Sequence, residues 1–360
     1  MLNTEEPGAS VKSFEDLDSL IGPVPFDVVA DLRTVDTVLG TTALLPDVLP
    51  GLLSSLGERA RAVSIESSAA LDGIVVPRRR SAAVIAGDVD RLHGREEQEL
   101  AGCRDAFDHV AQEDRGPLDV DLVLDVHRLL LARTPTPGGR LRRVESVVLD
   151  RDPRAARVKR FTPVAVADVP AHLDELVARY RGALTTARHH PVLLTGLFAL
   201  DLVAIRPFTT ANGRLARALT PGLLHDAGYD VVQYVSLDAA IARSAEAHAT
   251  ALLDSTADWQ DGRHDPWPWL RSLVRALADC SGELSSLVAT ARSGRSKQER
   301  VRTYVLQHAG RSFRMSDARA ALPGVSDQTI RLVLSELKRD GLVEVDGVGR
   351  SAAWSTVRAR

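Results

Sequence analysis

Four residues near the middle of the chain have the types and the spacing of a phosphate-binding site: Asn212, Gly213, Arg214 and Arg217. Asn-Gly marks a turn and a helix start, where unpaired backbone N–H groups and the positive end of the helix dipole attract anions. Arg214 and Arg217 are three residues apart, so a helix places them on one face. The sequence therefore predicts an anion site here, although Asn-Gly alone also fits a plain turn.

A strongly apolar helix has to position this site. Residues 192–205 are apolar around the whole helical wheel except at Thr195, Gly196 and Asp201, and a helix with no polar face must be buried. Arg206-Pro207 ends this helix, because the residue before a proline is pushed out of the helical region. We expect two helices, joined by a short loop, at the centre of an α-helical core.

The loop and the second helix start carry a longer motif. Residues 206–217 read RPFTTANGRLAR, which resembles the Fic motif HPFxDGNGRxxR. The matching positions are Pro207, Phe208, Asn212, Gly213, Arg214 and Arg217. Arg206 stands in place of the motif histidine, Thr210 in place of the acidic residue and Ala211 in place of the first glycine. The resemblance covers about residues 60 to 275 in order. It implies a mainly α fold, a Fic-type helical domain with a small β-hairpin flap.

The resemblance also implies a chemistry. Fic enzymes transfer AMP from ATP, with Mg²⁺, to a Ser, Thr or Tyr hydroxyl of a target protein. The motif histidine takes the hydroxyl proton, the acidic residue holds Mg²⁺, and the loop and the arginines hold the phosphates. Arg206 cannot be the base because its pKa stays above about 12, and losing a general base costs about 10²–10⁴ in rate. Thr210 offers Mg²⁺ only a neutral oxygen. The phosphate-binding residues that remain are Ala211, Asn212, Gly213, Arg214 and Arg217.

Two functions follow from this combination. One is a nucleotide-binding protein, a pseudoenzyme whose AMP transfer is weak or absent and which acts as a regulator through a DNA-binding domain. The other is an active AMP-transferring or other nucleotidyl-transferring enzyme that uses a different base. The substitution at Arg206 favours the first function.

A second motif precedes this domain. Residues 64–74 read SIESSAALDGI, a pattern that fits a helix C-terminus with Gly73 as left-handed cap. The stretch also resembles the inhibitory helix of Fic proteins, [S/T]xxxE[G/N], with Ser68 and Gly73 matching and Asp72 replacing glutamate. In the family that glutamate pairs with the second motif arginine, here Arg217, and obstructs the nucleotide. Asp72 is one methylene shorter, so whether it reaches Arg217 stays open.

The segments between the two motifs supply further helices and the flap. Residues 97–112 and 118–133 have amphipathic helical patterns, and His127 beside the apolar stripe is interpreted as a packing or hydrogen-bonding residue. A helix at 168–181 begins at Asp168, a plausible N-cap. Two β-like runs, 147–149 and 158–164, resemble the family's hairpin flap, which positions a target peptide by strand addition.

The C-terminal residues have a charge of their own. Residues 295–360 contain 13 Lys and Arg against 7 Asp and Glu, a net charge of +6, whereas the remainder has 32 against 41, a net charge of −9. Three helical patterns and a hairpin resemble a winged helix-turn-helix, so we predict duplex DNA binding. A winged helix used only for packing or dimerisation is the alternative. The residues expected to contact DNA are Gln328, Thr329, Arg331, Lys338 and Arg350.

Length and composition set the organisation. At 360 residues the chain can hold two or three domains. We divide it into a flexible leader (1–25), an N-terminal helical segment (26–95), the Fic domain (96–280), a linker (281–294) and the winged helix (295–360). No apolar run is long enough for a membrane span, the N-terminus is polar, and Cys103 and Cys280 are the two cysteines. We expect a cytoplasmic protein with no membrane partner. Four lysines beside abundant arginine indicate a GC-rich bacterial genome. The oligomeric state, a homodimer included, stays open.

Overall fold

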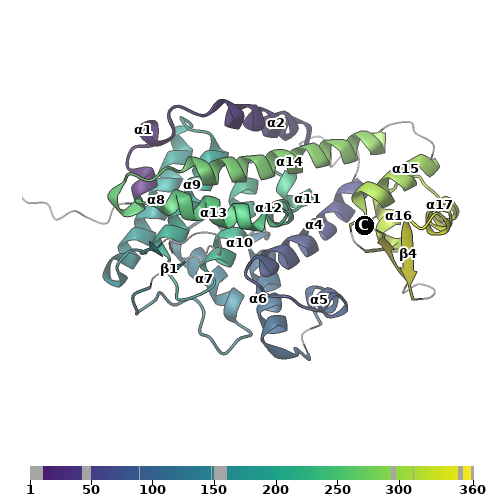
Figure 1. Ribbon diagram of the computed structural model, residues 1–360, viewed down its shortest axis with the longest axis horizontal. Coiled ribbons are helices and arrows are strands. Elements are labelled where there is room, and N and C mark those ends of the chain that lie inside the picture. The colour runs from purple at the N-terminus through teal and green to yellow at the C-terminus, as the bar shows by residue number, and fades with distance from the viewer. Residues whose placement is uncertain are drawn as a thin grey trace, which may run out of the picture.

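The computed structural model describes residues 11–42, 50–88, 90–146, 148–149, 160–292, 297–310, 312–347 and 352–357. Its fold is mainly helical, as expected (Figure 1). The elements before residue 160 are η1 (Lys12–Phe14), α1 (Leu17–Ile21), α2 (Phe26–Thr42), α4 (Pro50–Leu71), α5 (Arg78–Ile85), α6 (Gly94–Val110), α7 (Val120–Leu131) and β1 (Val148–Leu149). The elements from 160 to 292 are β2 (Arg160–Phe161), η2 (Val166–Asp168), α8 (Val169–Thr186), α9 (Pro191–Ile205), α10 (Asn212–Asp226), α11 (Val231–Tyr234), α12 (Leu237–Ala242), α13 (Ala245–Thr256), η3 (Trp259–Asp261) and α14 (Trp267–Arg292).

Helix α9 lies at the centre of the core, as its composition predicted. Every residue from 192 to 202 is buried, and the helix packs against α8, α10 and α14. Its polar side chains have partners: Thr195 Oγ1 lies 3.1 Å from the Tyr180 hydroxyl, and the Asp201 carboxylate accepts a hydrogen bond from Trp259 Nε1 at 2.6 Å. Satisfied in this way, they do not require the helix to face water.

The N-terminal residues differ from the expected flexible leader. Residues 1–10 lie outside the described part, but η1 and α1 are ordered against the core. Val11 and Phe14 are buried, and the backbone N–H and hydroxyl of Ser13 both donate to Asp201 in α9. The expectation of a leader to residue 25 is therefore wrong from residue 11 onward. The segment that holds Ser13 is ordered by a hydrogen bond to the buried Asp201 carboxylate, far away in the sequence.

The expected linker at 281–294 is also different. Helix α14 continues through this segment to Arg292. Leu284, Leu287 and Val288 are buried at helical spacing, so they extend the apolar stripe of α14 and keep the serine-rich segment helical. Residues 293–296 lie outside the described part.

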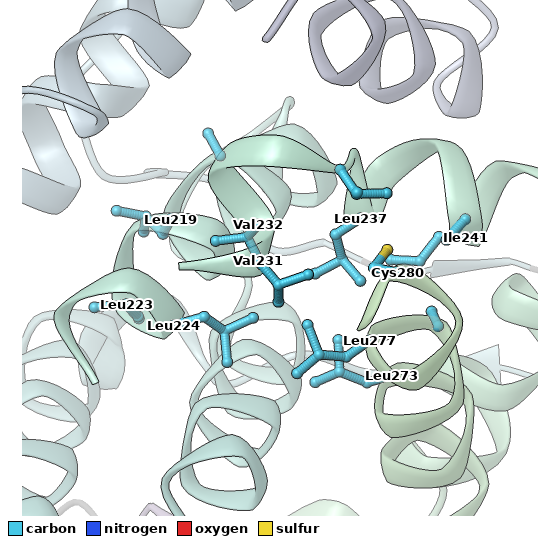
Figure 2. Close-up of a cluster of buried hydrophobic side chains, with 14 of the residues drawn as sticks. Leu219, Leu223, Leu224, Val231, Val232, Leu237, Ile241, Leu273, Leu277 and Cys280 are labelled. Atoms are coloured by element: carbon cyan, nitrogen blue, oxygen red, sulfur yellow. The ribbon is translucent and has the colours of Figure 1, made fainter. Parts of the chain in front are cut away.

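A second apolar layer forms where α10, α11, α12 and α14 meet. Figure 2 shows side chains from these four helices converging on one cluster. The labelled members are Leu219, Leu223, Leu224, Val231, Val232, Leu237, Ile241, Leu273, Leu277 and Cys280, and all are buried. This layer fixes α10, the helix that carries both motif arginines, against the rest of the body.

The predicted hairpin strands pair as expected. β1 and β2 are antiparallel, with Val148 opposite Phe161; most of the residues between the two strands lie outside the described part. At the start of α8, Asp168 occupies the N-cap position but its side chain makes no capping hydrogen bond. Among the described residues no helix is both long and apolar enough to cross a membrane.

The C-terminal unit, which we define as the described residues from 297 onward, has three helical segments and a three-stranded antiparallel sheet. Its elements are α15 (Lys297–Thr303), the π-helical η4 (Tyr304–His308), β3 (Phe313–Arg314), α16 (Met315–Ala321), α17 (Asp327–Arg339), β4 (Val343–Asp346) and β5 (Ala353–Thr356). The first helical segment is formed by α15 and by η4, which follows it directly. The strand order is β3-β5-β4. The Ser326 hydroxyl caps α17 by accepting from the Thr329 N–H at 3.2 Å. The sequence predicted the hairpin of β4 and β5 but not β3.

Candidate functional site

The site is built on the turn between α9 and α10. Arg206 is the C-cap of α9 and adopts a left-handed conformation with φ 51° and ψ 63°. Its backbone N–H still donates to Leu202 O at 3.1 Å. The chain therefore leaves α9 sharply at Arg206-Pro207, as the sequence predicted, and returns to start α10 at Asn212.

Asn212 holds this turn closed with its side chain. Its Oδ1 accepts a hydrogen bond from the Phe208 N–H at 3.0 Å, and its Nδ2 donates to Phe208 O at 2.7 Å. The side chain is 2% exposed. Because both ends of the amide are used within the turn, Asn212 shapes the helix start instead of offering its own side chain to a ligand.

His127 supports the same turn from α7. Its Nδ1 accepts from the Gly139 N–H at 2.9 Å, so we assign the proton to Nε2, which donates to Thr210 O at 3.1 Å. Its ring stacks on Phe208 with centroids 3.6 Å apart. Burial lowers the pKa of His127 to about 4. The sequence interpretation of His127 as a packing and hydrogen-bonding residue agrees with this environment.

Ala211 occupies a position that favours glycine. It is the N-cap of α10, has φ 60° and ψ 15°, and is 7% exposed. An L-residue in this left-handed region costs about 1–2 kcal/mol relative to glycine. The backbone path of the turn is therefore kept although the glycine is not.

Arg217 and Arg214 are both held by one carboxylate. Arg217 Nη2 lies 2.6 Å from Asp72 Oδ1, and Arg214 Nε lies 2.9 Å from Asp72 Oδ2. Arg217 also donates from Nε to the Ser68 hydroxyl at 2.9 Å and from Nη2 to Ser68 O at 3.0 Å. Gly73 follows with φ 78° and ends the turn after α4. The open question is answered: Asp72 reaches Arg217, and Arg214 as well.

Gly213 makes room for this arrangement. A Cβ atom at this position would lie 3.1 Å from Arg217 Nη1 and 3.5 Å from Asp72 Oδ1. A side chain here would crowd the Arg217 guanidinium and touch Asp72, so the glycine leaves room for their contact.

Arg214 has a second anionic neighbour that the sequence did not reveal. Glu99 of α6 places Oε2 3.1 Å from Arg214 Nη1, an ion pair without the alignment of a hydrogen bond. The Arg214 side chain is 4% exposed and that of Glu99 8%, whereas Asp72 is 26% exposed. Glu99 is thus a buried, permanent partner, and Asp72 is the accessible one.

The Arg206 side chain has a different environment. Its Nε donates to the Ser146 hydroxyl at 3.2 Å, and no carboxylate lies within ion-pair distance among the described residues. Burial, followed by the neighbouring charge of Arg142, lowers the pKa of Arg206. Arg142 itself is 3% exposed and donates from Nε to Arg206 O at 2.8 Å. Among the described residues Arg206 is therefore a half-buried cation with no carboxylate within ion-pair distance.

Thr210 is half-buried, and its carbonyl oxygen is used by His127. Within the described ranges no cluster of three or more His, Cys, Asp or Glu could hold a metal ion. The donors present therefore do not form a protein-only Mg²⁺ site. A magnesium ion here would depend on Thr210 and on the phosphates of a nucleotide.

A small apolar pocket adjoins the arginines. It is lined by Gly213 and Arg217 of α10, by α9, α12, α13 and α14, and by two buried polar residues, Asp238 and His248. The Asp238 carboxylate has the Ser68 side chain and the charge of Arg217 as neighbours, and His248 Nδ1 has no hydrogen-bond partner among the described residues. Burial raises the pKa of Asp238 to about 7 and lowers the pKa of His248 to about 4.

The sequence of the central segment decides the family. Residues 117–224 match the profile of the Fic/DOC family. This segment is a Fic/DOC family domain. It contains α7 to α10, the hairpin strands and all of the turn described above.

The Fic domain also has relatives of known sequence and structure. Over 175 residues, 48% of its length, this chain is 28% identical to "Protein adenylyltransferase Fic" of Culex quinquefasciatus. The matched region spans only 29% of that protein. A Fic family protein from Desulfovibrio desulfuricans has the same fold, with a TM-score of 0.58 and 19% identity over 94% of this chain and 98% of its own. A Fic domain containing signaling protein from Bacteroides thetaiotaomicron has a TM-score of 0.58 and 18% identity over 75% of this chain and 99% of its own. The expected Fic-type helical fold is confirmed.

The structure brings together most of the residues that the sequence singled out. The seven site residues between Arg206 and Arg217 lie on one turn and one helix, and Ser68 and Asp72 come to them from α4 and the turn that follows it. Glu99 and Arg142 were not identified as site residues, because neither lies within the two motifs at 64–74 and 206–217. Gln328, Thr329, Arg331 and Lys338 lie on α17 in the C-terminal unit, far along the chain from this site, and Arg350 lies outside the described residues.

Proposed function

We propose that the Fic domain binds the phosphates of a nucleotide, ATP in the first instance, at Arg214 and Arg217. The observation that supports this is the Asp72 carboxylate shared by both guanidinium groups. Phosphate oxygens are better partners for this pair, because charge-assisted and bidentate contacts to arginine are among the strongest hydrogen bonds in proteins. A phosphate that displaces Asp72 leaves Glu99 in place, so Arg214 stays oriented.

Asp72 then acts as an internal competitor. Ser68 and Asp72 occupy three donors of Arg217 in the absence of nucleotide. A nucleotide phosphate has to break these contacts first. The apparent nucleotide affinity is therefore the intrinsic affinity multiplied by the fraction of protein in which the arginines are free. This is the role that the resemblance to an inhibitory helix implied for Asp72.

AMP transfer, we propose, is weak or absent. Arg206 stands where the base is needed and remains a cation. His127 does not replace it, because both of its ring nitrogens are bonded to backbone groups and its pKa is low. Arg206 instead adds a positive charge beside the loop, where it would hold an anion and not accept a proton. A target hydroxyl could still approach along β1 and β2.

The second candidate is an active enzyme that transfers AMP by a different base. The contact of Asp72 with both arginines favours it, since an inhibitory contact is useful where there is an activity to restrain. The two candidates differ in how much AMP transfer should rise when the motif histidine and acidic residue are restored, a comparison described in the Discussion.

Calorimetry with ATP and Mg²⁺ tests nucleotide binding. Asp72→Asn removes the charge that competes for the arginines, so we expect it to raise the ATP affinity by about tenfold or more. The matched control is Asp88→Asn, which changes an exposed aspartate paired with Arg80 at 3.6 Å and should leave the affinity unchanged. Absence of ATP binding in both the native chain and Asp72→Asn would refute the proposed nucleotide site.

We further propose that the C-terminal unit is a winged helix that binds duplex DNA. The exposed face of α17 carries Gln328, Arg331, Ser335 and Lys338. Arg331 and Lys338 form no ion pair within the described part of the chain, so both can contact phosphates. Thr329 is half-buried and bonded to Ser326 at 2.9 Å, which makes it a capping residue and a weaker candidate for contact.

Electrophoretic or fluorescence binding of the full chain to duplex DNA over a range of salt concentrations tests this role. Arg331→Ala and Lys338→Ala should each reduce the salt slope of the affinity by about one. Arg263→Ala, an exposed arginine on the helical body that pairs with Asp261, should not. No DNA binding, or binding that is insensitive to salt, would assign the unit to packing or dimerisation.

A further inference from the structure

Helix α4 connects the proposed nucleotide site to the C-terminal unit. It runs without interruption from Pro50 to Leu71, which corresponds to about 33 Å at 1.5 Å per residue. In Figure 1 it extends from the helical body toward α15 and α16. Its two halves have different partners, and each half carries buried side chains.

The first half of α4 packs on the C-terminal unit. The Ser55 hydroxyl donates to Asp317 O of α16 at 3.4 Å, and a Cβ on Gly51 would lie 3.7 Å from Ala320 O. Leu52 and Leu56 are 2% exposed. Arg59 continues the contact toward α14, where its Nη2 lies 3.3 Å from Glu283.

The second half of α4 packs on the helical body and ends beside the arginines. The Ser64 hydroxyl donates to the Ser236 hydroxyl, the N-cap of α12, at 2.8 Å. Ile65 and Ser68 are fully buried. One turn later the Asp72 carboxylate meets Arg214 and Arg217.

We propose that α4 couples the arginine pair to the docking of the C-terminal unit, so that releasing Asp72 loosens α16 from α4 and detaching α16 from α4 releases Asp72. The proposal rests on the proposed function in that the ligand which releases Asp72 is a nucleotide. A ligand of the C-terminal unit that changes its docking would then change nucleotide affinity, and nucleotide would change the affinity for that ligand by the same factor.

The physical basis is the cooperativity of a helix packed at both ends. Most of the stability of a helix in a protein comes from the tertiary packing of one face, so α4 keeps its position through its contacts. Loss of the contacts at one end lowers the free energy that holds the other end in place. Because Asp72 follows directly after the last residue of α4 and is the accessible partner of the arginines, a shift of α4 changes its contact with them.

Two neighbouring serines allow a matched test in the full chain. Ser55 is buried against Asp317, whereas Ser54 on the same helix is exposed. Ser55→Glu forces a longer, charged side chain between α4 and α16, and Ser54→Glu makes the same change in solvent. With ATP and Mg²⁺ in calorimetry, Ser55→Glu should raise the affinity by about fivefold or more, the scale of typical coupling between sites, and Ser54→Glu by less than about twofold.

Hydrogen–deuterium exchange supplies a readout that needs no nucleotide. In Asp72→Asn, which changes only a partly exposed side chain, residues 315–321 of α16 should exchange faster than in the native chain. In Asp88→Asn they should not. Circular dichroism shows whether Ser55→Glu folds. If it does not, the exchange of residues 315–321 in Asp72→Asn still tests the coupling.

The outcomes separate the two proposals. If Asp72→Asn strengthens ATP binding but Ser55→Glu leaves it unchanged, and exchange of α16 in Asp72→Asn equals that of the native chain, the coupling is wrong and the nucleotide site stands. If ATP binds to none of the variants, the nucleotide site is wrong, and exchange of α16 alone decides the coupling: faster exchange in Asp72→Asn supports it and equal exchange overturns it.

Discussion

The Asp72 carboxylate lies 2.6 Å from Arg217 Nη2 through one oxygen and 2.9 Å from Arg214 Nε through the other. Gly213 presents no side chain beside this contact, which leaves room for the Arg217 guanidinium next to Asp72. Asp72, although shorter than the glutamate of the inhibitory motif, thus bridges the two guanidinium groups with its two carboxylate oxygens. One exposed carboxylate therefore occupies both motif arginines at once.

Restoring the motif should create AMP transfer. In an Asp72→Asn background, Arg206→His with Thr210→Asp supplies a base and a metal ligand, so we expect the rate to rise by about 10²–10⁴ over Asp72→Asn alone. Mass spectrometry for a +AMP adduct on the protein or on added target measures it. Arg206→Gln with Thr210→Asp is the control, because glutamine cannot accept the proton. Equal AMP transfer by Asp72→Asn and the restored variant would show that another residue of the native chain acts as base.

The two motif arginines should both contribute to nucleotide affinity once Asp72 no longer competes. In the Asp72→Asn background, Arg214→Ala and Arg217→Ala should each weaken ATP binding by about tenfold or more, since each removes a charge-assisted contact. Arg243→Ala removes an exposed arginine 4.0 Å from Asp279 and should have no effect. Calorimetry measures all three. An unchanged affinity for Arg214→Ala and Arg217→Ala would place the nucleotide elsewhere.

Asp238 should make stability depend on pH in a defined direction. Burial raises its pKa to about 7 in the folded chain, against about 3.9 in an unfolded chain. The folded state therefore holds the proton more tightly, and this contribution to stability is full below pH 4 and is lost as the pH rises through 7. Asp238→Asn has no proton to lose, so its melting temperature relative to the native chain should increase from pH 5 to pH 8. Asp121→Asn, at an exposed position, should show no such trend.

Ala211 and a helical alanine should respond oppositely to glycine. Ala211 has φ 60°, so Ala211→Gly relieves about 1–2 kcal/mol of left-handed strain, which exceeds the added entropy of the unfolded chain. Ala178 is exposed within α8, and Ala178→Gly should cost about 1 kcal/mol. Denaturant unfolding measures both. A loss of stability in Ala211→Gly comparable to that in Ala178→Gly would contradict the assignment of strain to this turn.

The sequence alone predicted the elements whose signals are local. Residues 192–205 have no polar face, so burial follows from composition, and Arg206-Pro207 ends the helix for a steric reason within the chain. The spacing of Arg214 and Arg217 on α10, the cap at Gly73 and the C-terminal helices were accessible for the same reason. The resemblance to the Fic motif added the fold, and the comparisons confirmed it.

Tertiary structure decided what depends on residues far apart. Asp201 in α9 orders Ser13 and the N-terminal segment, which polar composition alone suggested to be mobile. Leu284 and Leu287 keep α14 helical where serines suggested a linker, because a partner surface exists for them to bury. Whether Asp72 reaches Arg217 depended on how closely α4 approaches α10, a distance set by packing. Aspartate is shorter than glutamate by one methylene, which changes the position of the carboxylate by little more than a bond length. Only the folded backbone determines the distance between two helices to that precision.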